Sequence, residues 1–299
     1  MTTHVEQCPL CGGRQSNLFD QRKFHQQTVI NRLCKHCGMV FQSPRMSDAE
    51  LDSFYQAEYR QLYQGSAGPN AKDLAIQRSR AQALVEFAQT AIKPGVRHLD
   101  IGCSSGLLLQ GFAQACATTP TGIEPGDAYR SYAQASGIPV YPSLDALLAE
   151  QPDRFGLISM AHVLEHIAEP VVYLRTLQEQ LLQPDGWLLL EVPNLYAHDS
   201  FEVAHLLAFS PHTLAQTVQQ AGYEVQFSRQ TGLPRSRLIP LYLQLLARPV
   251  PYLQIAPVRP EKQVRLKRQL GLGRRKLLTR LFPRLAWQTP NASPAQEIV

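Results

Sequence analysis

The pattern of apolar and polar positions divides residues 71–249 into short apolar runs separated by amphipathic stretches. Five runs of strand length are each bounded by glycine, proline or polar residues: 96–101, the run that ends at Glu124, a short run after Gly137, 155–162 and 186–194. Amphipathic stretches with helix start and stop residues lie around them: 71–92, 107–115, the stretch after Ser143, 170–185 and 210–221. Regular alternation of strand and helix predicts an α/β fold with a mostly parallel sheet.

Two further apolar segments, 223–230 and 238–247, follow the last predicted helix and are joined by a turn with the sequence TGLPRS. They predict an antiparallel hairpin at the edge of the sheet. Open α/β sheets bind ligands at the carboxyl ends of their strands, so side chains at those ends should face one cleft. The candidates at these positions are Asp100, Glu124, His162 and Asn194.

A glycine turn with the sequence LDIGCSSG follows the first predicted strand. Its Asp100-x-Gly102-x-x-x-Gly106 spacing brings backbone close to a ligand at the start of a helix, where N–H groups lack partners. The second strand ends in Glu124, a carboxylate that can accept hydrogen bonds from ribose hydroxyls. The spacing matches neither the dinucleotide fingerprint nor a phosphate-binding loop that ends in Gly-Lys-Ser/Thr.

The segments LDIGCSSG and GIEPG resemble motifs I and II of the class I S-adenosylmethionine (SAM) dependent methyltransferases. The resemblance covers roughly residues 70–230 and implies a Rossmann-like core with a seven-stranded, mostly parallel sheet. It also implies that Asp100, Gly102 and Gly106 hold the methionine part of SAM and that Glu124 holds the ribose. Asp145 is a weaker candidate for the adenine contact, because after Ser143 it also fits the first turn of an ordinary helix.

Two cysteine pairs, CPLCGG and CKHCGM, stand near the start of the chain. Each pair places two thiolates on one tight turn, and two such turns supply the four sulfurs that a structural zinc site prefers. An apolar segment with the sequence QTVINRL between them predicts a strand, as in a zinc ribbon. The expected zinc ligands are Cys8, Cys11, Cys34 and Cys37; free thiols or a redox pair are the alternative.

The chain of 299 residues has 44% hydrophobic and 18% charged residues, which is typical of a globular protein with a buried core. It lacks an apolar run of the roughly 18 residues that a membrane helix needs, and its first residues lack the pattern of a signal peptide. We therefore expect a cytoplasmic protein. The predicted parts are a zinc ribbon (1–47), a helical lid or linker (48–69), the methyltransferase domain (70–249) and a basic extension (250–299).

The linker contains a predicted helix that begins after Ser47 and Glu50, which fit a capping box. An aromatic face on this helix either packs on the next domain or forms a lid in which Tyr59 or Tyr63 faces the substrate.

Two histidines and a glutamate follow the fourth predicted strand in the sequence MAHVLEHIAEP. On one helical turn His162, Glu165 and His166 share a face. Methyl transfer from a sulfonium needs alignment and, for a hydroxyl or carbon acid, a base. Histidine suits that role because its ordinary pKa lies near neutrality. The catalytic candidates are therefore His166, Glu165 and His162, whereas His198 and His212 are expected at the surface or in helix caps.

Further resemblances bear on this cluster. Sugar C-methyltransferases of antibiotic biosynthesis resemble the chain in combining an N-terminal zinc-binding region with a Glu-His pair after strand four, which implies base catalysis by Glu165 and His166. Small-RNA 2′-O-methyltransferases carry a similar motif, Glu-x-x-Glu-His with a later His, that binds a divalent metal, which implies a site at Glu165, His166 and His205. Quinone O-methyltransferases carry a related motif. With His162 in place of a carboxylate, such a site suits Zn²⁺, Mn²⁺ or Fe²⁺ better than Mg²⁺. A role in closing the cofactor pocket is the third possibility.

The net charge of +5 is concentrated in the C-terminal extension, where ten Lys/Arg and two Glu follow residue 249. Clustered cations mixed with Leu, Phe and Trp predict docking on an acidic protein or on the chain's own core, an amphipathic segment on an anionic membrane, or nucleic-acid binding.

Together these features predict a SAM-dependent methyltransferase that acts on oxygen or carbon of a small or carrier-linked acceptor, such as a sugar, secondary-metabolite or glycan intermediate. The alternatives are an RNA methyltransferase and a non-catalytic SAM-binding scaffold.

Overall fold

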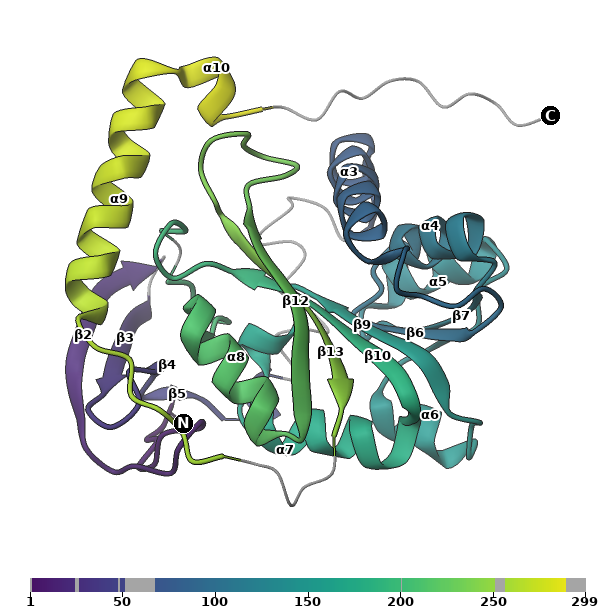
Figure 1. Ribbon diagram of the computed structural model, residues 1–299, viewed down its shortest axis with the longest axis horizontal. Coiled ribbons are helices and arrows are strands. Elements are labelled where there is room, and N and C mark those ends of the chain that lie inside the picture. Colours follow the sequence, from purple (N-terminus) through teal and green to yellow (C-terminus); the bar gives the residue numbers. More distant parts are fainter. Residues whose placement is uncertain are drawn as a thin grey trace.

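The computed structural model describes residues 2–24, 27–47, 49–51, 68–199, 201–250 and 256–288. Figure 1 shows a twisted central sheet with helices on both sides, a smaller sheet beside it and a long C-terminal helix at the outer edge. Tyr59 and Tyr63, proposed above to face the substrate, lie outside the described residues.

The central sheet has seven strands in the order β12-β13-β10-β9-β6-β7-β8. Its parallel part consists of β6 (Arg97–Ile101), β7 (Thr119–Ile123), β8 (Val140–Tyr141), β9 (Phe155–Ala161) and β10 (Leu182–Pro193). The edge strand β12 (Tyr223–Thr231) and its neighbour β13 (Tyr242–Pro249) form an antiparallel pair, and β13 is also antiparallel to β10. The predicted seven-stranded, mostly parallel sheet is confirmed.

Two apolar cores lie on opposite faces of this sheet because side chains alternate along each strand. Leu188 and Leu190 of β10 belong to one core and Leu189 belongs to the other. The first core packs against α6 (Leu144–Ala149), α7 (Pro170–Thr176) and α8 (Pro211–Gln220). The second packs against α3 (Ala71–Ala88) and α4 (Leu107–Cys116). A further helix, α5 (Asp127–Ala135), packs beside α4 through a small cluster of its own.

The helix predicted for 170–185 is shorter than expected. After α7 the chain makes a π-helical turn at Leu177–Leu181, and β10 begins directly at Leu182. Leu182 pairs with Phe155 of β9, with an irregularity in register before Trp187. Gly186 therefore lies inside the strand instead of ending the helix, because pairing with β9 takes the place of the last helical turn.

The N-terminal region forms a second sheet of four strands in the order β11-β4-β3-β2. Three of them are local: β2 (Ser16–Phe24), β3 (Gln27–Cys34) and β4 (Val40–Gln42). A two-residue antiparallel pair, β1 (Thr2–Thr3) with β5 (Arg45–Met46), joins the two ends of the same region. The fourth strand, β11 (Leu207–Ala208), comes from the segment between β10 and α8. The cysteine region is thus joined to the main body by a shared sheet as well as by a shared apolar core.

Side chains cap three of the helix starts. Asn70 caps α3, Ser143 caps α6 and Ser210 caps α8, each accepting a hydrogen bond from a backbone N–H in the first turn. The capping box of Ser47 and Glu50 is also present: the carboxylate accepts from the Ser47 N–H at 2.9 Å.

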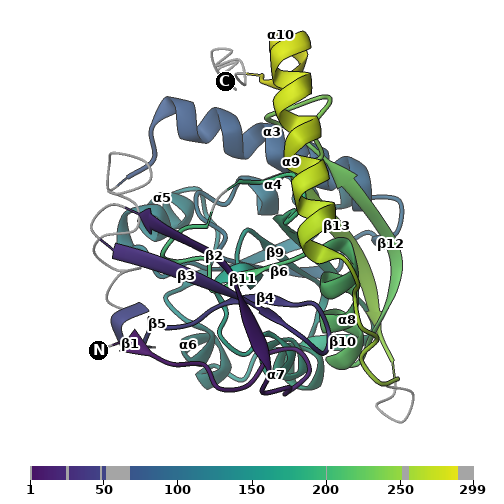
Figure 2. The same ribbon diagram turned by 90° about the vertical axis from the view of Figure 1, so that its left-hand side faces the viewer.

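The basic extension contains α9 (Val264–Leu281) and α10 (Pro283–Ala286). Figure 2 shows α9 along the outside of the molecule, between the four-stranded sheet on one side and β12 on the other. The sequence allows three predictions for this segment. The inner face of α9, where Val264 and Arg268 are buried, docks on the chain's own core. Among the described residues, no helix combines the length and hydropathy of a membrane span.

Candidate active site

A cavity of about 1100 Å³ opens at the carboxyl ends of the parallel strands. Of the residues predicted to bind cofactor or to take part in catalysis, its wall includes Asp100, Gly102, Glu124, His162 and His166. His205, the third residue of the predicted metal site, also lines it. The topology therefore brings the glycine turn and the histidine cluster to one cleft.

The two glycines of the turn are required for different reasons. Gly102 has φ +72°, and a Cβ there would lie 2.5 Å from Cγ2 of Val163, so a side chain would clash beside the cavity. Gly106 has φ +77° and precedes α4, where a Cβ would lie 2.7 Å from Cδ1 of Ile138. Gly106 does not line the cavity. It permits close packing under the turn, whereas Gly102 stands at the cavity wall.

Glu124 is buried at the end of β7 and fixed by backbone donors. The Ser104 N–H donates to its Oε2 at 3.0 Å and the Gly126 N–H donates to its Oε1 at 3.0 Å. These bonds hold the carboxylate against the glycine turn with both oxygens oriented, as a ribose-binding acid requires.

Asp100 is buried below the glycine turn. The Ser159 hydroxyl donates to its Oδ1 at 2.6 Å, and the same hydroxyl lies 2.7 Å from Nε2 of His98. Burial raises the pKa of Asp100 to about 7, opposed by the Ser159 hydrogen bond and supported by the nearby Glu124 charge. Asp145 differs: it is exposed in the first turn of α6 and lies outside the cavity wall.

The second cluster forms around a short 3₁₀ helix at Leu164–His166. Candidate ligand atoms of Glu165, His166 and His205 all lie within 4.8 Å of one another. His166 Nδ1 lies 2.8 Å from the carbonyl oxygen of Ala204, so Nδ1 carries the proton and Nε2 offers a lone pair. Burial lowers the pKa of His166, although the Glu165 charge opposes the shift, and this favours the neutral imidazole.

Glu165 is the unusual member of this cluster. Its side chain is 1% exposed, and neither carboxylate oxygen has a hydrogen-bond partner among the described residues. Burial raises its pKa, but the His162 contact and the neighbouring imidazoles of His166 and His205 outweigh that effect and lower the pKa to about 2. A buried, ionised carboxylate beside two imidazoles is a donor set that fits a divalent transition metal.

His162 bridges two buried carboxylates. Its Nδ1 lies 3.3 Å from Oε1 of Glu165 and its Nε2 lies 3.3 Å from Oε1 of Glu191. Burial and the Arg80 charge lower its pKa, but the two carboxylates raise it further, so the net shift is upward. His162 therefore favours the charged form and balances the charges of Glu165 and Glu191, and of the two predicted imidazoles it is His166 that favours the neutral form.

Three residues of the cavity environment had no signal in the sequence. Arg80 on α3 pairs with Glu191 at 2.9 Å, and its guanidinium lies over the Tyr242 ring at 5.6 Å from the centroid. These residues come from three distant segments, and only the fold brings them together.

Two expectations need correction. His198 lines the cavity instead of standing at the surface, whereas His212 on α8 lies 2.8 Å from the Arg259 carbonyl oxygen, away from the cavity. Asn194 does not face the cavity, because its amide N–H₂ bonds Gln230 and the Pro240 carbonyl, and its oxygen accepts from the Tyr196 N–H.

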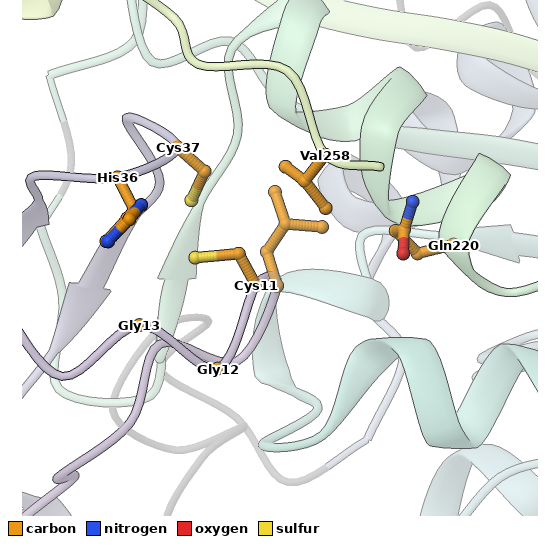
Figure 3. Close-up of a pocket in the computed structure, with 8 residues that line it drawn as sticks. Cys11, Gly12, Gly13, His36, Cys37, Gln220 and Val258 are labelled. Carbon is orange, nitrogen blue, oxygen red and sulfur yellow. The ribbon is translucent and has the colours of Figure 1, made fainter. Parts of the chain in front are cut away.

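The four N-terminal cysteines form a second candidate metal centre. Sγ of Cys8 lies 3.5 Å from that of Cys37, Sγ of Cys11 lies 3.6 Å from that of Cys34, and all four lie within 4.8 Å of one another. Figure 3 shows the Cys11 and Cys37 sulfurs side by side on their two turns, next to a hollow of about 440 Å³. Four converging sulfurs fit the tetrahedral, closed shell of a structural zinc.

Comparison with known proteins agrees with this arrangement. A family model described as "Methyltransferase domain" matches residues 74–226. The ubiquinone biosynthesis O-methyltransferase of Nitrosospira multiformis is 29% identical over 204 residues, which cover 64% of this chain and 82% of that protein. The protein of the same name from Xanthomonas euvesicatoria is 30% identical over 159 residues, which cover 51% of this chain and 64% of that protein, less than two thirds of its length.

A solved structure shows the same fold. The Burkholderia thailandensis 1,6-didemethyltoxoflavin-N1-methyltransferase, with bound 1,6-didemethyltoxoflavin and S-adenosylhomocysteine, has a TM-score of 0.56. It is 16% identical and covers 78% of this chain and 100% of that chain. At this identity the likeness concerns the fold alone.

Proposed function

The chain belongs to the methyltransferase-domain family and has the class I SAM-dependent fold, and from this premise we propose that it methylates a hydroxyl oxygen of a small acceptor. The O-methyltransferases among its relatives support oxygen as the acceptor atom. Membership of an enzyme family also favours catalysis over the non-catalytic scaffold. Methylation of a sugar carbon, a glycan intermediate or RNA stays a prediction from the sequence.

In the proposed complex, SAM occupies the side of the cavity formed by the glycine turn. Gly102 leaves room for the methionine part, and Glu124 accepts hydrogen bonds from the ribose. The acceptor then lies towards His166 and His205, which line the same cavity. Holding both reactants in one cavity supplies the alignment that methyl transfer requires.

The observation that carries the proposal is the buried Glu165–His166–His205 cluster beside the cofactor site. The unsatisfied oxygens of Glu165 favour a divalent metal over a lone histidine base, and these three residues would hold it. Such an ion would lower the pKa of an acceptor hydroxyl. His162 and Glu191 keep the Glu165 carboxylate in place, and the Ala204 carbonyl fixes the tautomer of His166.

Metal analysis and turnover together test this proposal. We expect purified protein to hold zinc at the four cysteines and a second, weaker divalent ion, and His205→Ala to lose only the second. His212→Ala, at a histidine outside the cavity, is the matched control and should keep both. Turnover with a panel of hydroxylated acceptors should fall by about 100-fold or more in His166→Ala, with SAM affinity retained. Full turnover after exhaustive chelation, or unchanged turnover in His166→Ala, would contradict the proposed role.

A further inference from the structure

The C-terminal helix α9 is fixed on the protein by its inner face. Arg268 is buried and donates to the carbonyl oxygens of Leu195 and His198, the latter at 3.2 Å. Two helical turns further on, Arg275 donates to the Ala197 carbonyl oxygen at 2.9 Å. At Gly271, between them, a Cβ would lie only 2.0 Å from the Tyr196 carbonyl oxygen, so the helix lies directly on the loop after β10. The orientation of α9 about its axis is therefore set.

The outer face of α9 carries a stripe of exposed leucines. Leu266, Leu270, Leu277 and Leu281 are 48%, 65%, 56% and 57% exposed. At about 100° per residue these four positions fall within one narrow sector, directly opposite the docked Arg268. The leucine stripe is thus turned to solvent by the same contacts that fix the inner face.

Cations border this stripe on both sides. On the same helical wheel, Lys276 and Arg280 flank one side of the leucines, while Arg274 and Lys267, which also pairs with Glu261 at 2.9 Å, flank the other. All four are exposed, and the sequence has no Asp or Glu from Lys262 to Gln296. Beyond the helix end Phe282 and Leu285 are 50% and 43% exposed, whereas Trp287 lies on the docked side of α9, where its ring stacks on Arg275 and its Nε1–H donates to Thr279 at 3.1 Å.

We propose that this surface, the α9–α10 segment Val264–Trp287, lies on an anionic lipid surface. Leucines between two cationic borders match the boundary between acyl chains and phosphate headgroups. Nucleic acid would satisfy the cations but would leave the leucines in water. An acidic protein would need an apolar groove as long as the helix to cover the leucines. An anionic lipid surface covers the leucines and pairs with the cations without such a groove.

The same segment lies beside the cavity. The Arg237 N–H donates to the Leu285 carbonyl oxygen at 3.1 Å, and the Gln288 N–H donates to the Arg235 carbonyl oxygen at 2.8 Å. Arg235 itself lines the cavity. Resting on the proposed function, the consequence is that the acceptor partitions into the lipid surface and enters the cavity from there. The lipid binding itself does not depend on the reaction.

Vesicle sedimentation with the full chain tests the proposal. We expect binding to vesicles made of equal parts phosphatidylcholine and phosphatidylglycerol, little binding to phosphatidylcholine alone, and weaker binding as salt rises. The double variant Leu270→Asp/Leu277→Asp should bind the anionic vesicles at least about tenfold more weakly. Tyr132→Asp, at a large exposed side chain on α5, is the matched control and should bind like wild type.

Three outcomes would overturn the proposal. These are a wild type that ignores both kinds of vesicle, a double variant that binds like wild type, and RNA binding at the same salt without vesicle binding. The thermal midpoint and SAM affinity of the double variant should match those of wild type because its leucines are exposed, and this excludes misfolding as the cause. Vesicle binding without turnover on any acceptor would refute the proposed function but would still support lipid binding by the α9–α10 segment.

Discussion

The backbone N–H of Gln42, on the last strand of the cysteine region, donates to the carbonyl oxygen of Leu206 at 2.7 Å. The Gln42 side chain also donates to the Glu202 carbonyl oxygen at 3.3 Å. His205 stands between these two anchored carbonyls, and the carbonyl of Ala204 orients His166. The cysteine region therefore holds the loop that completes the candidate catalytic cluster.

Loss of the zinc centre should reduce catalysis more than cofactor binding. Cys34→Ser removes one proposed zinc ligand, and the loop at 202–206 then loses the rigid sheet to which Gln42 anchors it. We expect kcat to fall by about tenfold or more, because small displacements of reacting groups are costly. SAM affinity should change by less than about twofold, since Gly102 and Glu124 lie on other elements.

Calorimetric titration with SAM and steady-state kinetics measure the two quantities separately. A variant is preferable to a chelator here, because a chelator would also remove an ion from Glu165. Cys116→Ser, at a buried cysteine of the second core, controls for the loss of a thiol. Equal losses in kcat and SAM affinity would point to general unfolding and contradict the coupling.

The sequence predicted the parts of the site that are local and missed those that depend on tertiary packing. The glycine turn and Glu124 lie within about twenty-five residues of each other, and their spacing follows from one βαβ unit. The cysteine pairs are equally local. The π-helical turn before β10 was missed because strand pairing, which no local pattern encodes, decided where the helix ends.

The Glu191–Arg80 pair was missed for the same reason. Glu191 stands in an apolar strand whose sequence predicts a buried core strand. Its partner Arg80 lies on a helix more than a hundred residues earlier. Buried charges are tolerated only when paired, but no local pattern identifies the cation that pairs with Glu191. His198 was likewise judged from its local sequence, whereas its position follows from the fold of the loop after β10.

The raised pKa of Asp100 makes SAM binding depend on pH. A buried carboxyl with a pKa of about 7 is partly protonated near neutrality, and the positive charge of SAM favours the ionised form. SAM affinity should therefore rise by roughly threefold to tenfold between about pH 6 and about pH 8.

In the absence of SAM, the folded chain retains a proton on Asp100 that the unfolded chain has already lost. The stability contributed by Asp100 is therefore lost as pH rises towards 7.

Isothermal titration with SAM across this pH range provides the measurement. Asp100→Asn removes the titrating group and should flatten the profile, while it can still accept the Ser159 hydrogen bond. Asp145→Asn makes the same chemical change at an exposed carboxylate outside the cavity and should preserve the wild-type profile. A pH dependence that survives in Asp100→Asn would assign it to another group.

Arg80→Ala should destabilise the fold because it leaves the carboxylate of Glu191 buried with too little compensation. The Glu191 side chain has no exposed surface, and Arg80 supplies its full positive charge at 2.9 Å, with Gln244 donating a hydrogen bond to the other oxygen. Removing one partner of a buried ion pair costs about 3 kcal/mol in unfolding free energy. Arg78→Ala, at an exposed arginine on the same helix, should change it by less than about 0.5 kcal/mol.

The double variant Arg80→Ala/Glu191→Gln separates charge from packing. Glu191→Gln removes the carboxylate charge, which faces only His162 once Arg80 is gone, and retains an oxygen that can accept from Gln244. The double variant should therefore be more stable than Arg80→Ala alone, by about 1 to 2 kcal/mol. Urea unfolding followed by circular dichroism measures all four members of this cycle. If the two changes add with no coupling, Arg80 contributes through its packing over Tyr242 and the ion pair is not what stabilises this part of the cavity wall.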